Sequence, residues 1–231
     1  KNAAEKVNFL SANPFSFFHI ITDLENQESQ NAYGILCFPE SRIRNKYPLI
    51  LGVNGSKNWA DHHLEYMEMY RKMGFATFEI QSFNSRNVNS TVGDQTTVTT
   101  AMMILDSYKA LEVLGKDNRI DIDNVAITGW SLGGGVALFS AWEPLIASIG
   151  IKERFKAHLA FYPPCLAEMD LIEFSKDVVG VEINSAIKNI YSMIIGSGQS
   201  LNRSSSLFQK SILEMKYITK YFKGKEETVL S

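Results

Sequence analysis

The sequence predicts an α/β protein whose mostly parallel sheet is covered by helices on both faces. Short runs rich in β-branched and aromatic residues alternate with longer runs of helical periodicity. Some of the short runs are apolar almost throughout, which is typical of strands buried on both faces of a sheet. Parallel strands need crossover connections, and the helical runs between the strands supply them.

Three strands are predicted in the first quarter of the chain. They lie near Phe17–Thr22, Ala32–Phe38 and Leu49–Val53. The third follows the turn-prone segment Lys46-Tyr47-Pro48 and is apolar, so we expect it to be fully buried.

Helices and strands then alternate. Apolar residues recur between charged ones from Ala60 to Met73, which predicts an amphipathic helix ended by Gly74. Phe75–Ile80 predicts the next strand. A second helical pattern covers Asp94–Leu114, and the β-branched run Val125–Thr128 predicts a further strand.

Composition and charge exclude several classes of protein. With 231 residues, 45% hydrophobic and 21% charged, we expect a single domain over residues 1–231, with an atypical segment at 175–231. The net charge is −2 and Lys and Arg are scattered, so nucleic acid is not an expected partner. No apolar run approaches the roughly 20 residues of a membrane-spanning helix, so no membrane partner is expected either.

The two cysteines and the first residue leave other properties open. Cys37 and Cys165 form neither a metal-ligand spacing nor a disulfide framework, so we expect two half-buried thiols and no metal site. The chain begins with Lys1, which fits a processed mature form, a trimmed chain or a gene fragment. The localisation, whether cytoplasmic or periplasmic or secreted after processing, and the oligomeric state therefore stay open.

A G-x-S-x-G sequence carries the clearest chemistry. Gly129-Trp130-Ser131-Leu132-Gly133 follows a predicted strand and precedes the small-residue helix start Gly134-Gly135. A sharp strand-to-helix turn leaves no room for bulky neighbours of the serine, and the glycines meet that demand. Ser131 is thus the candidate nucleophile, and the Leu132 amide, at the helix N-terminus, is the candidate oxyanion donor. The rival interpretation is a glycine-rich turn with a chance serine.

A second oxyanion donor is expected from the loop after the third strand. Asn54 and Gly55 occupy that place, and the glycine permits close approach of the backbone. A plain surface turn rich in Asn, Gly and Ser is the alternative. Trp59 and Trp130 suggest an apolar pocket wall for a substrate, although packing in the core explains them equally well.

Several segments occur in the same order as in the dienelactone hydrolase family, which the chain resembles over about residues 1–165. Besides the G-x-S-x-G sequence they are Asn54-Gly55-Ser56, Trp59-Ala60-Asp61-His62-His63, Gly74-Phe75-Ala76-Thr77-Phe78, Gln81-Ser82-Phe83-Asn84-Ser85-Arg86, Ser90-Thr91-Val92-Gly93-Asp94-Gln95, Arg119-Ile120-Asp121 and the run from Phe155 to Cys165. One departure is Asn54-Gly55, which stands where similar proteins have His-Gly.

This resemblance implies an α/β-hydrolase fold, with the last strand or strands as the part that the chain does not visibly supply. It implies hydrolysis of a small-molecule ester or lactone through a nucleophile, a histidine and an acid, with no metal or organic cofactor. The nucleophile would be Ser131, in place of the cysteine of some relatives.

The expected histidine is not evident. In this family the acid and then the histidine follow the nucleophile, and only His158 follows Ser131. It lies in an apolar run, so we interpret it as structural. His19, His62 and His63 have the wrong chain order for a triad base. His62 and His63 begin a helix, where we favour a solvated or capping role, and they remain candidates for lining a substrate pocket.

The expected acid is not evident either. Ile194–Ser200 is the nearest match to the family's acidic turn and contains no carboxylate. Asp170, Glu173 and Asp177 are interpreted as solvated charges, and a polar helix is predicted from Leu207 to Lys225. Two hypotheses follow. The chain is a serine hydrolase of small esters or lactones with an unassigned base, or a catalytically impaired, truncated or frame-shifted homologue that only binds a ligand or partner.

Overall fold

The computed structural model describes residues 4–40, 45–164 and 220. The chain divides into two compact units, Lys1–Asp170 and Leu171–Ser231, and all described residues except Lys220 lie in the first. This boundary lies between residue 165, up to which the sequence resembles dienelactone hydrolases, and residue 175, where the atypical segment begins. The single domain over residues 1–231 stays a prediction, and the fold below is that of the first unit.

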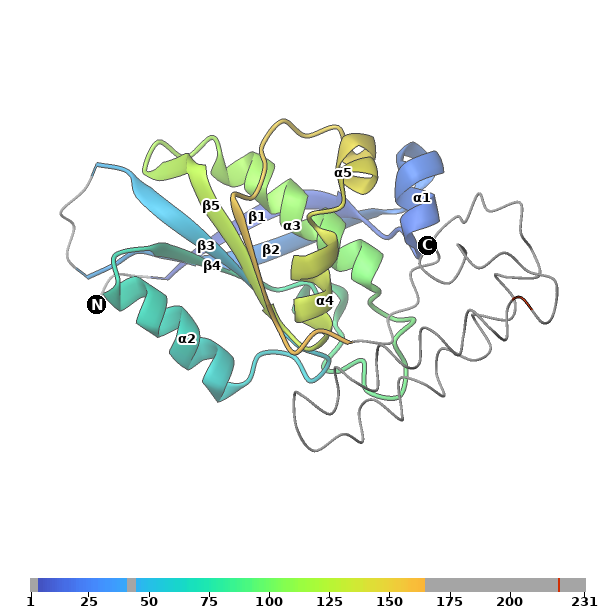
Figure 1. The fold of residues 1–231 in the computed structure, drawn as a ribbon, viewed down its shortest axis with the longest axis horizontal. Coiled ribbons are helices and arrows are strands. Elements are labelled where there is room, and N and C mark those ends of the chain that lie inside the picture. Colours follow the sequence, from blue (N-terminus) through green and yellow to red (C-terminus); the bar gives the residue numbers. More distant parts are fainter. Residues whose placement is uncertain (1–3, 41–44, 165–219, 221–231) are drawn as a thin grey trace. The chain divides into compact units, whose positions relative to one another are not determined.

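A six-stranded mixed sheet forms the centre of this unit (Figure 1). In spatial order its strands are β1 (Glu5–Ala12), β2 (Ser29–Cys37), β4 (Ala76–Ile80), β3 (Tyr47–Val53), β5 (Ile120–Trp130) and β6 (Ala157–Phe161). The four strands from β4 to β6 run parallel to one another. β2 is antiparallel to β4, and β1 is antiparallel to β2. The predicted α/β class with a mostly parallel sheet is confirmed.

Helices lie on both faces of the sheet (Figure 1). They are α1 (Phe17–Thr22), α2 (Asp61–Lys72), α3 (Thr100–Leu114), α4 (Leu132–Phe139) and α5 (Glu143–Ile149), with short 3₁₀ helices η1 (Leu24–Asn26) and η2 (Asn84–Arg86). Leu49, Leu51 and Val53 of β3 belong to the core on the side of α3 and α4. Ile50 packs with α2 through Met67. Alternate residues of β3 therefore serve opposite layers, which confirms that this strand is buried on both faces.

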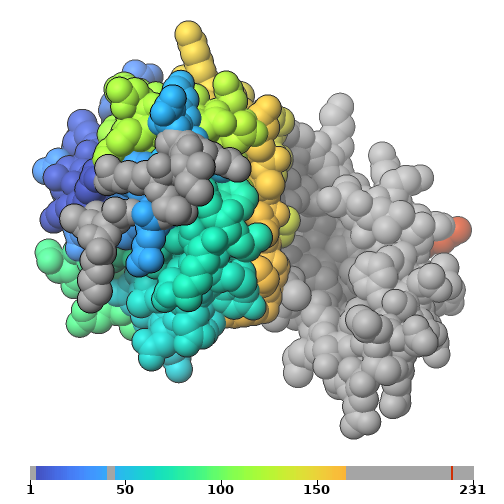
Figure 2. Space-filling model, turned by 90° about the vertical axis from the view of Figure 1, so that its left-hand side faces the viewer, coloured from blue at the N-terminus to red at the C-terminus, as the bar shows by residue number. Residues whose placement is uncertain are grey.

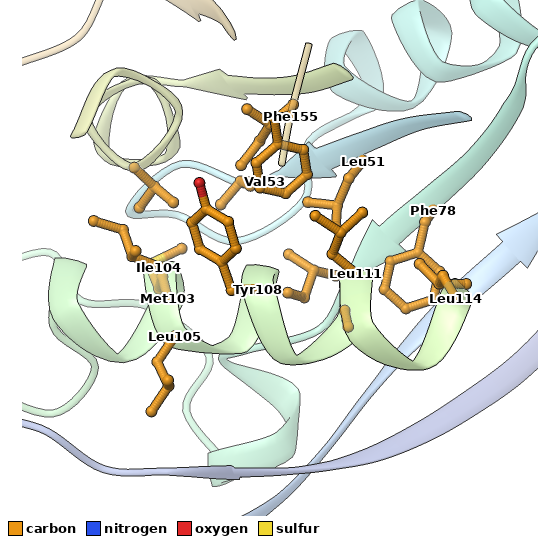
Figure 3. Close-up of a cluster of buried hydrophobic side chains, with 14 of the residues drawn as sticks. Leu51, Val53, Phe78, Met103, Ile104, Leu105, Tyr108, Leu111, Leu114 and Phe155 are labelled. Atoms are coloured by element: carbon orange, nitrogen blue, oxygen red, sulfur yellow. The ribbon is translucent and has the colours of Figure 1, made fainter. Parts of the chain in front are cut away.

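The larger core lies between the sheet and α3. Figure 3 shows Leu51 of β3 and Phe78 of β4 facing Tyr108 and Leu111 of the helix, and none of these side chains is exposed to solvent. The Tyr108 hydroxyl donates a hydrogen bond of 2.6 Å to the Ser140 carbonyl. Each large apolar side chain contributes about 1.5–3 kcal/mol when buried in this way.

The strand predicted at Phe17–Thr22 is wrong, because these residues form α1. Aromatic and β-branched residues favoured a strand, but Phe17 and Ile20 are the buried ones, and a spacing of three residues is helical. The helix packs against α5 and α3, so the tertiary contacts outweigh the local β propensity. The first strand of the chain is instead β1, which was not predicted.

Among the described residues, the other predicted elements agree with the structure to within a few residues, except at the starts of α3 and β5. Helix α3 begins at Thr100 rather than Asp94, because the Thr99 hydroxyl accepts the Met102 amide proton and caps the helix there. β5 extends on both sides of the predicted Val125–Thr128, and α5 was not predicted. The described thiol, that of Cys37, is half-buried and free, as expected.

Among the described residues, no single helix is long and apolar enough to cross a membrane, although α4 and α5, bent by 83° between them, have the length and composition of a span as a pair. No three His, Cys, Asp or Glu side chains gather there in a way that could hold a metal ion.

Candidate functional site

Ser131 occupies the sharp turn between β5 and α4. Its backbone angles are φ 55° and ψ −116°, a conformation that residues other than glycine rarely adopt. The Ser131 amide donates a hydrogen bond of 3.0 Å to the Phe161 carbonyl, and the Gly135 amide donates one of 3.0 Å to the Ser131 carbonyl. The strained turn is therefore held by the neighbouring strand on one side and by the helix on the other.

The glycines around Ser131 are sterically required. A methyl group on Gly129 would lie 2.0 Å from the Gly133 carbonyl oxygen. One on Gly133 would lie 2.3 Å from the Val53 oxygen, and one on Gly134 would lie 2.6 Å from the Phe161 oxygen. Because these contacts are with backbone atoms, they cannot be relieved by rotation of a side chain. The small flanking residues that the sequence indicated are those that the turn needs.

Asn54 and Gly55 follow β3 and lie beside Ser131. A methyl group on Gly55 would lie 3.1 Å from the Trp130 oxygen and 3.5 Å from Ser131 Cβ. Asn54 is fully buried, and its Nδ2 donates a hydrogen bond of 3.0 Å to the Gly55 carbonyl. Asn54 Oδ1 is buried without a hydrogen-bond partner among the described residues. The structure thus brings together the loop and the serine that the sequence singled out.

The Leu132 amide is the first of α4, so the helix itself offers it no acceptor. It lies next to Ser131 in the chain, in the place of an oxyanion donor. The oxyanion roles of Leu132, Asn54 and Gly55 and the nucleophilic role of Ser131 stay predictions.

Aromatic rings pack beneath this turn. Trp130 is 1% exposed and stacks on His63, with ring centroids 4.7 Å apart, and on Phe161, with centroids 5.8 Å apart. Trp59 is half-buried, donates from Nε1 to the Ile80 carbonyl at 3.0 Å and lies 6.2 Å from the Trp130 ring. These contacts fix both indoles, whose part in a substrate pocket stays a prediction.

His63 caps the start of α2. Its Nδ1 accepts a hydrogen bond of 3.2 Å from the Ala60 amide, and the side chain is 4% exposed. Burial and, secondly, the neighbouring His62 lower the pKa of His63 from 6.5 to about 4. The imidazole of His63 is therefore neutral near pH 7.

His62 is exposed and connects α2 to the end of β6. Its Nε2 is hydrogen-bonded to the Tyr162 hydroxyl at 3.1 Å. Figure 2 shows α2, in teal, beside the orange β6 segment, where the rings of Tyr66 and Phe161 are 5.4 Å apart. Tyr162 has a left-handed φ of 38°. Tyr162 was not predicted as a site residue, although its place directly after the apolar run that contains His158 was a signal.

His158 and His19 have structural partners. His158 Nδ1 donates to the Ala137 carbonyl at 2.9 Å, and His158 pairs with Ile127 in the sheet. Ile127 precedes Ser131 by four residues. The backbone of His158 therefore lies about 13 Å from Ser131 along the strand direction. His19 Nδ1 accepts the Ser16 amide proton at 3.3 Å and caps α1. The structural interpretation of His158 agrees with these contacts.

No hydrogen bond of the Ser131 hydroxyl is found among the described residues, so none of their imidazoles is placed as its base. Asp170, Glu173, Asp177 and the segment Ile194–Ser200 lie outside the described residues. So does the predicted helix from Leu207 to Lys225, apart from Lys220, which is helical.

A hollow of about 370 Å³ lies near the amino ends of the parallel strands, whereas Ser131 follows a carboxyl end. Pro48 and Leu49 at the start of β3 line it, together with Val125 and Lys156. Ser131 follows the carboxyl end of β5, where the crevices of open α/β sheets bind ligands. We therefore place the candidate site at Ser131 rather than at this hollow.

Part of the chain is similar to several solved structures. A protein from Klebsiella pneumoniae named as a dienelactone hydrolase is 16% identical over 69% of this chain and 60% of its own, with a TM-score of 0.45. One from Lactobacillus plantarum named as a carboxylesterase is 12% identical over 70% and 60%, with a TM-score of 0.46. A dienelactone hydrolase-like promiscuous phosphotriesterase from metagenomic libraries is 18% identical over 60% and 55%, with a TM-score of 0.39.

The chain is similar to dienelactone hydrolase-like and carboxylesterase-type α/β-hydrolases. It spans three fifths or less of the length of these structures. No curated protein matches the chain. A family model for the C-terminus of NAD-dependent glycerol-3-phosphate dehydrogenase matches residues 177–231, which is less than half of the chain. This match lies outside residues 1–165, over which the sequence resembles dienelactone hydrolases.

Proposed function

We propose that the chain is a serine hydrolase of the dienelactone hydrolase type, which cleaves small esters or lactones by nucleophilic attack of Ser131. The observation that carries this proposal is the strained backbone of Ser131, at φ 55°, between β5 and α4. Such strain costs about 1–3 kcal/mol and is found at functional sites. A chance serine in a loose glycine-rich turn would not need it.

The reaction that fits this turn is acyl transfer. Ser131 Oγ bonds to the substrate's carbonyl carbon, and the electron pair of the C=O double bond moves to the oxygen. The Leu132 amide and the Asn54–Gly55 loop stabilise that oxyanion. The oxyanion's electron pair then re-forms the C=O bond, the bond from the carbonyl carbon to the alkoxy oxygen breaks, and that oxygen takes up a proton to give an alcohol, which in a lactone stays attached to the acyl chain. The acyl group stays on Ser131 as an ester until water releases it as an acid. No metal or organic cofactor takes part in these steps.

The close approach of Gly55 to Ser131 supports the place of the oxyanion. A methyl group on Gly55 would be in van der Waals contact with Ser131 Cβ at 3.5 Å, so the backbone of this loop borders the serine side chain. The preference for small esters or lactones comes from the family resemblance. The base that accepts the Ser131 proton is not assigned.

Covalent labelling tests the proposal. The full chain is treated with a serine-directed fluorophosphonate and its intact mass is measured, with Ser131→Ala as the matched variant. In this reaction Ser131 Oγ bonds to phosphorus, fluoride leaves, and the hydroxyl proton passes to the buffer. We expect labelling of the parent chain and none of Ser131→Ala. Hydrolysis of p-nitrophenyl acetate and of a small lactone then measures turnover.

The second candidate function is binding without catalysis. It is favoured by the Ser131 hydroxyl, which has no hydrogen-bonded imidazole among the described residues. A serine without a base is a weak nucleophile, although oxyanion stabilisation alone can leave about 10³-fold catalysis over water. Folded protein that is neither labelled nor active, yet is stabilised against heat by an ester or lactone, would support binding alone.

A further inference from the structure

The imidazole of His63 is fixed beside the turn that carries Ser131. His63 is the third residue of α2, and its side chain is 4% exposed. Its ring stacks on Trp130 with an interplanar angle of 24°, and the Trp59 ring meets it edge-on at 6.0 Å. Trp130 directly precedes Ser131, so the ring of His63 cannot turn away from the site without losing this stack.

His63 and Ser131 approach each other at Gly55. The methyl position on Gly55 is 3.5 Å from Ser131 Cβ and 3.8 Å from His63 Cε1. Cε1 is the ring carbon between the two nitrogens, so the polar edge of the imidazole faces the oxyanion loop. The imidazole and the serine therefore border the same small space.

The hydrogen bond at Nδ1 decides which nitrogen carries the proton. The Ala60 amide donates to Nδ1 at 3.2 Å, so Nδ1 holds a lone pair and the proton of the neutral ring lies on Nε2. The helix N-terminus and burial both disfavour the imidazolium form. They agree with the lowered pKa of about 4. His63 is thus a donor at Nε2 and cannot serve as a base there.

No hydrogen-bond partner of this Nε2–H is found among the described residues. This nitrogen is not among the fully buried side-chain atoms that lack a partner in the described part of the chain, so solvent or a substrate can reach it. A substrate oxygen in the space beside Gly55 would pair with it. The neighbouring His62 differs, since it is exposed and its Nε2 is bonded to Tyr162.

We propose that His63 is a neutral hydrogen-bond donor of the Ser131 site, whose Nε2–H binds the carbonyl oxygen of the substrate and the oxyanion that forms from it. A neutral imidazole at a helix N-terminus can polarise a carbonyl in this way. His63 keeps its proton throughout, so no bond to it forms or breaks. This role rests on the proposed function and adds a side-chain donor to the backbone donors named above.

The test compares the rate of fluorophosphonate labelling in His63→Phe and His63→Gln. Phenylalanine keeps a ring on Trp130 but has no donor and no cap acceptor, whereas glutamine keeps an acceptor for the Ala60 amide and carries N–H donors. We expect His63→Phe to be labelled about 10²–10³-fold more slowly than the parent chain. His63→Gln should recover most of that loss.

His19→Phe is the matched control for the loss of the cap. His19 is also the third residue of its helix and also accepts a backbone amide proton at Nδ1, but α1 packs on α5 and α3. We expect its labelling rate to equal that of the parent chain. Thermal unfolding of each variant shows that the compared proteins are folded.

Nitrogen-15 NMR of the parent chain gives a readout besides the rate. We expect a protonated Nε2 for His63 at pH 7 and a downfield shift of its proton once the phosphonyl oxygen occupies the site. Labelling of His63→Phe at the parent rate, or an Nε2 proton that does not respond to labelling, would overturn the role of His63 alone. A folded parent chain that is not labelled at all would overturn the proposed function, and this role with it.

Discussion

The backbone amide of Ser131 donates a hydrogen bond of 3.0 Å to the carbonyl oxygen of Phe161, the last residue of β6. The same strand follows β5 in the sheet, with Trp130 paired to Phe161. The hydrogen bond therefore continues the sheet ladder through the strained serine. It uses the Ser131 amide and leaves the next amide, that of Leu132, for the oxyanion role proposed above.

Replacement of Ser131 by glycine is expected to stabilise the fold. Glycine adopts φ 55° without strain, whereas Ser131→Ala keeps the strain and loses only the hydroxyl. We expect Ser131→Gly to unfold with a free energy about 1 kcal/mol higher than that of Ser131→Ala, by urea denaturation. Both variants lose labelling. Equal stability of the two would argue against strain at this residue.

Gly129→Ala and Gly135→Ala should differ sharply. The methyl group on Gly129 meets the Gly133 backbone at 2.0 Å, whereas the one on Gly135 meets the side chain of Pro164 at 3.3 Å. We expect a loss of about 3 kcal/mol or more, or no folded protein, for Gly129→Ala. Gly135→Ala should be within about 1 kcal/mol of the parent, because alanine favours the helix. Circular dichroism during thermal unfolding gives both values.

Acid should weaken the fold through His63. Its pKa is about 4 in the folded chain and near 6.5 when unfolded, so between these values the unfolded state binds a proton that the folded state does not. The contribution to stability is complete above pH 6.5, falls as the pH drops and is lost below about pH 4. We expect a loss on the order of 2–3 kcal/mol across this window.

His63→Phe is the control for the pH dependence, since phenylalanine does not titrate. Chemical denaturation at pH 7, 5.5 and 4 should show a smaller loss of stability for the variant than for the parent chain. Parallel pH profiles for the two proteins would mean that His63 titrates at its ordinary pKa.

The buried ion pair of Arg86 and Asp106 should be costly to break. Nη1–Oδ2 is 2.7 Å, and the two side chains are 6% and 0% exposed. We expect Asp106→Leu to lower the free energy of unfolding by about 3–5 kcal/mol, because Arg86 would keep a buried unpaired charge. In the double variant Arg86→Met/Asp106→Leu the loss should be smaller than the sum of the single losses, by denaturant unfolding.

Much of the fold could be predicted from local patterns. The run Leu49–Val53 is apolar and short, so it predicts a strand buried on both faces, which β3 is. At Phe17–Thr22 the same reasoning fails, since a six-residue segment rich in Phe and Ile satisfies either period and its packing on α5 decides. β1 was missed because Val7 and Phe9 are the main apolar signal on its inner face, and much of its order comes from pairing with β2.

The candidate site was predictable where chain order fixes geometry. A strand, a glycine-flanked serine and a helix predict the turn at Ser131, and a loop after a buried strand predicts the place of Gly55. The stack of His63 on Trp130 was not predictable, because it joins residues from different layers of the fold. The same is true of the hydrogen bond between His62 and Tyr162. Side-chain contacts of this kind follow from how α2 docks on the sheet, which no local pattern encodes.

The backbone contact at Gly133 also bears on how the chain folds. Gly133 sits against the carbonyl oxygens of Val53 and Asn54, which are far from it in sequence and meet it only once β3 has paired with β5. Contacts between distant segments form late, because closing the intervening chain costs entropy before they repay it. A folding chain with all of its helices formed would thus still lack the contact between the turn at Ser131 and the loop at Asn54. The turn and the loop would therefore meet only when β3 pairs with β5.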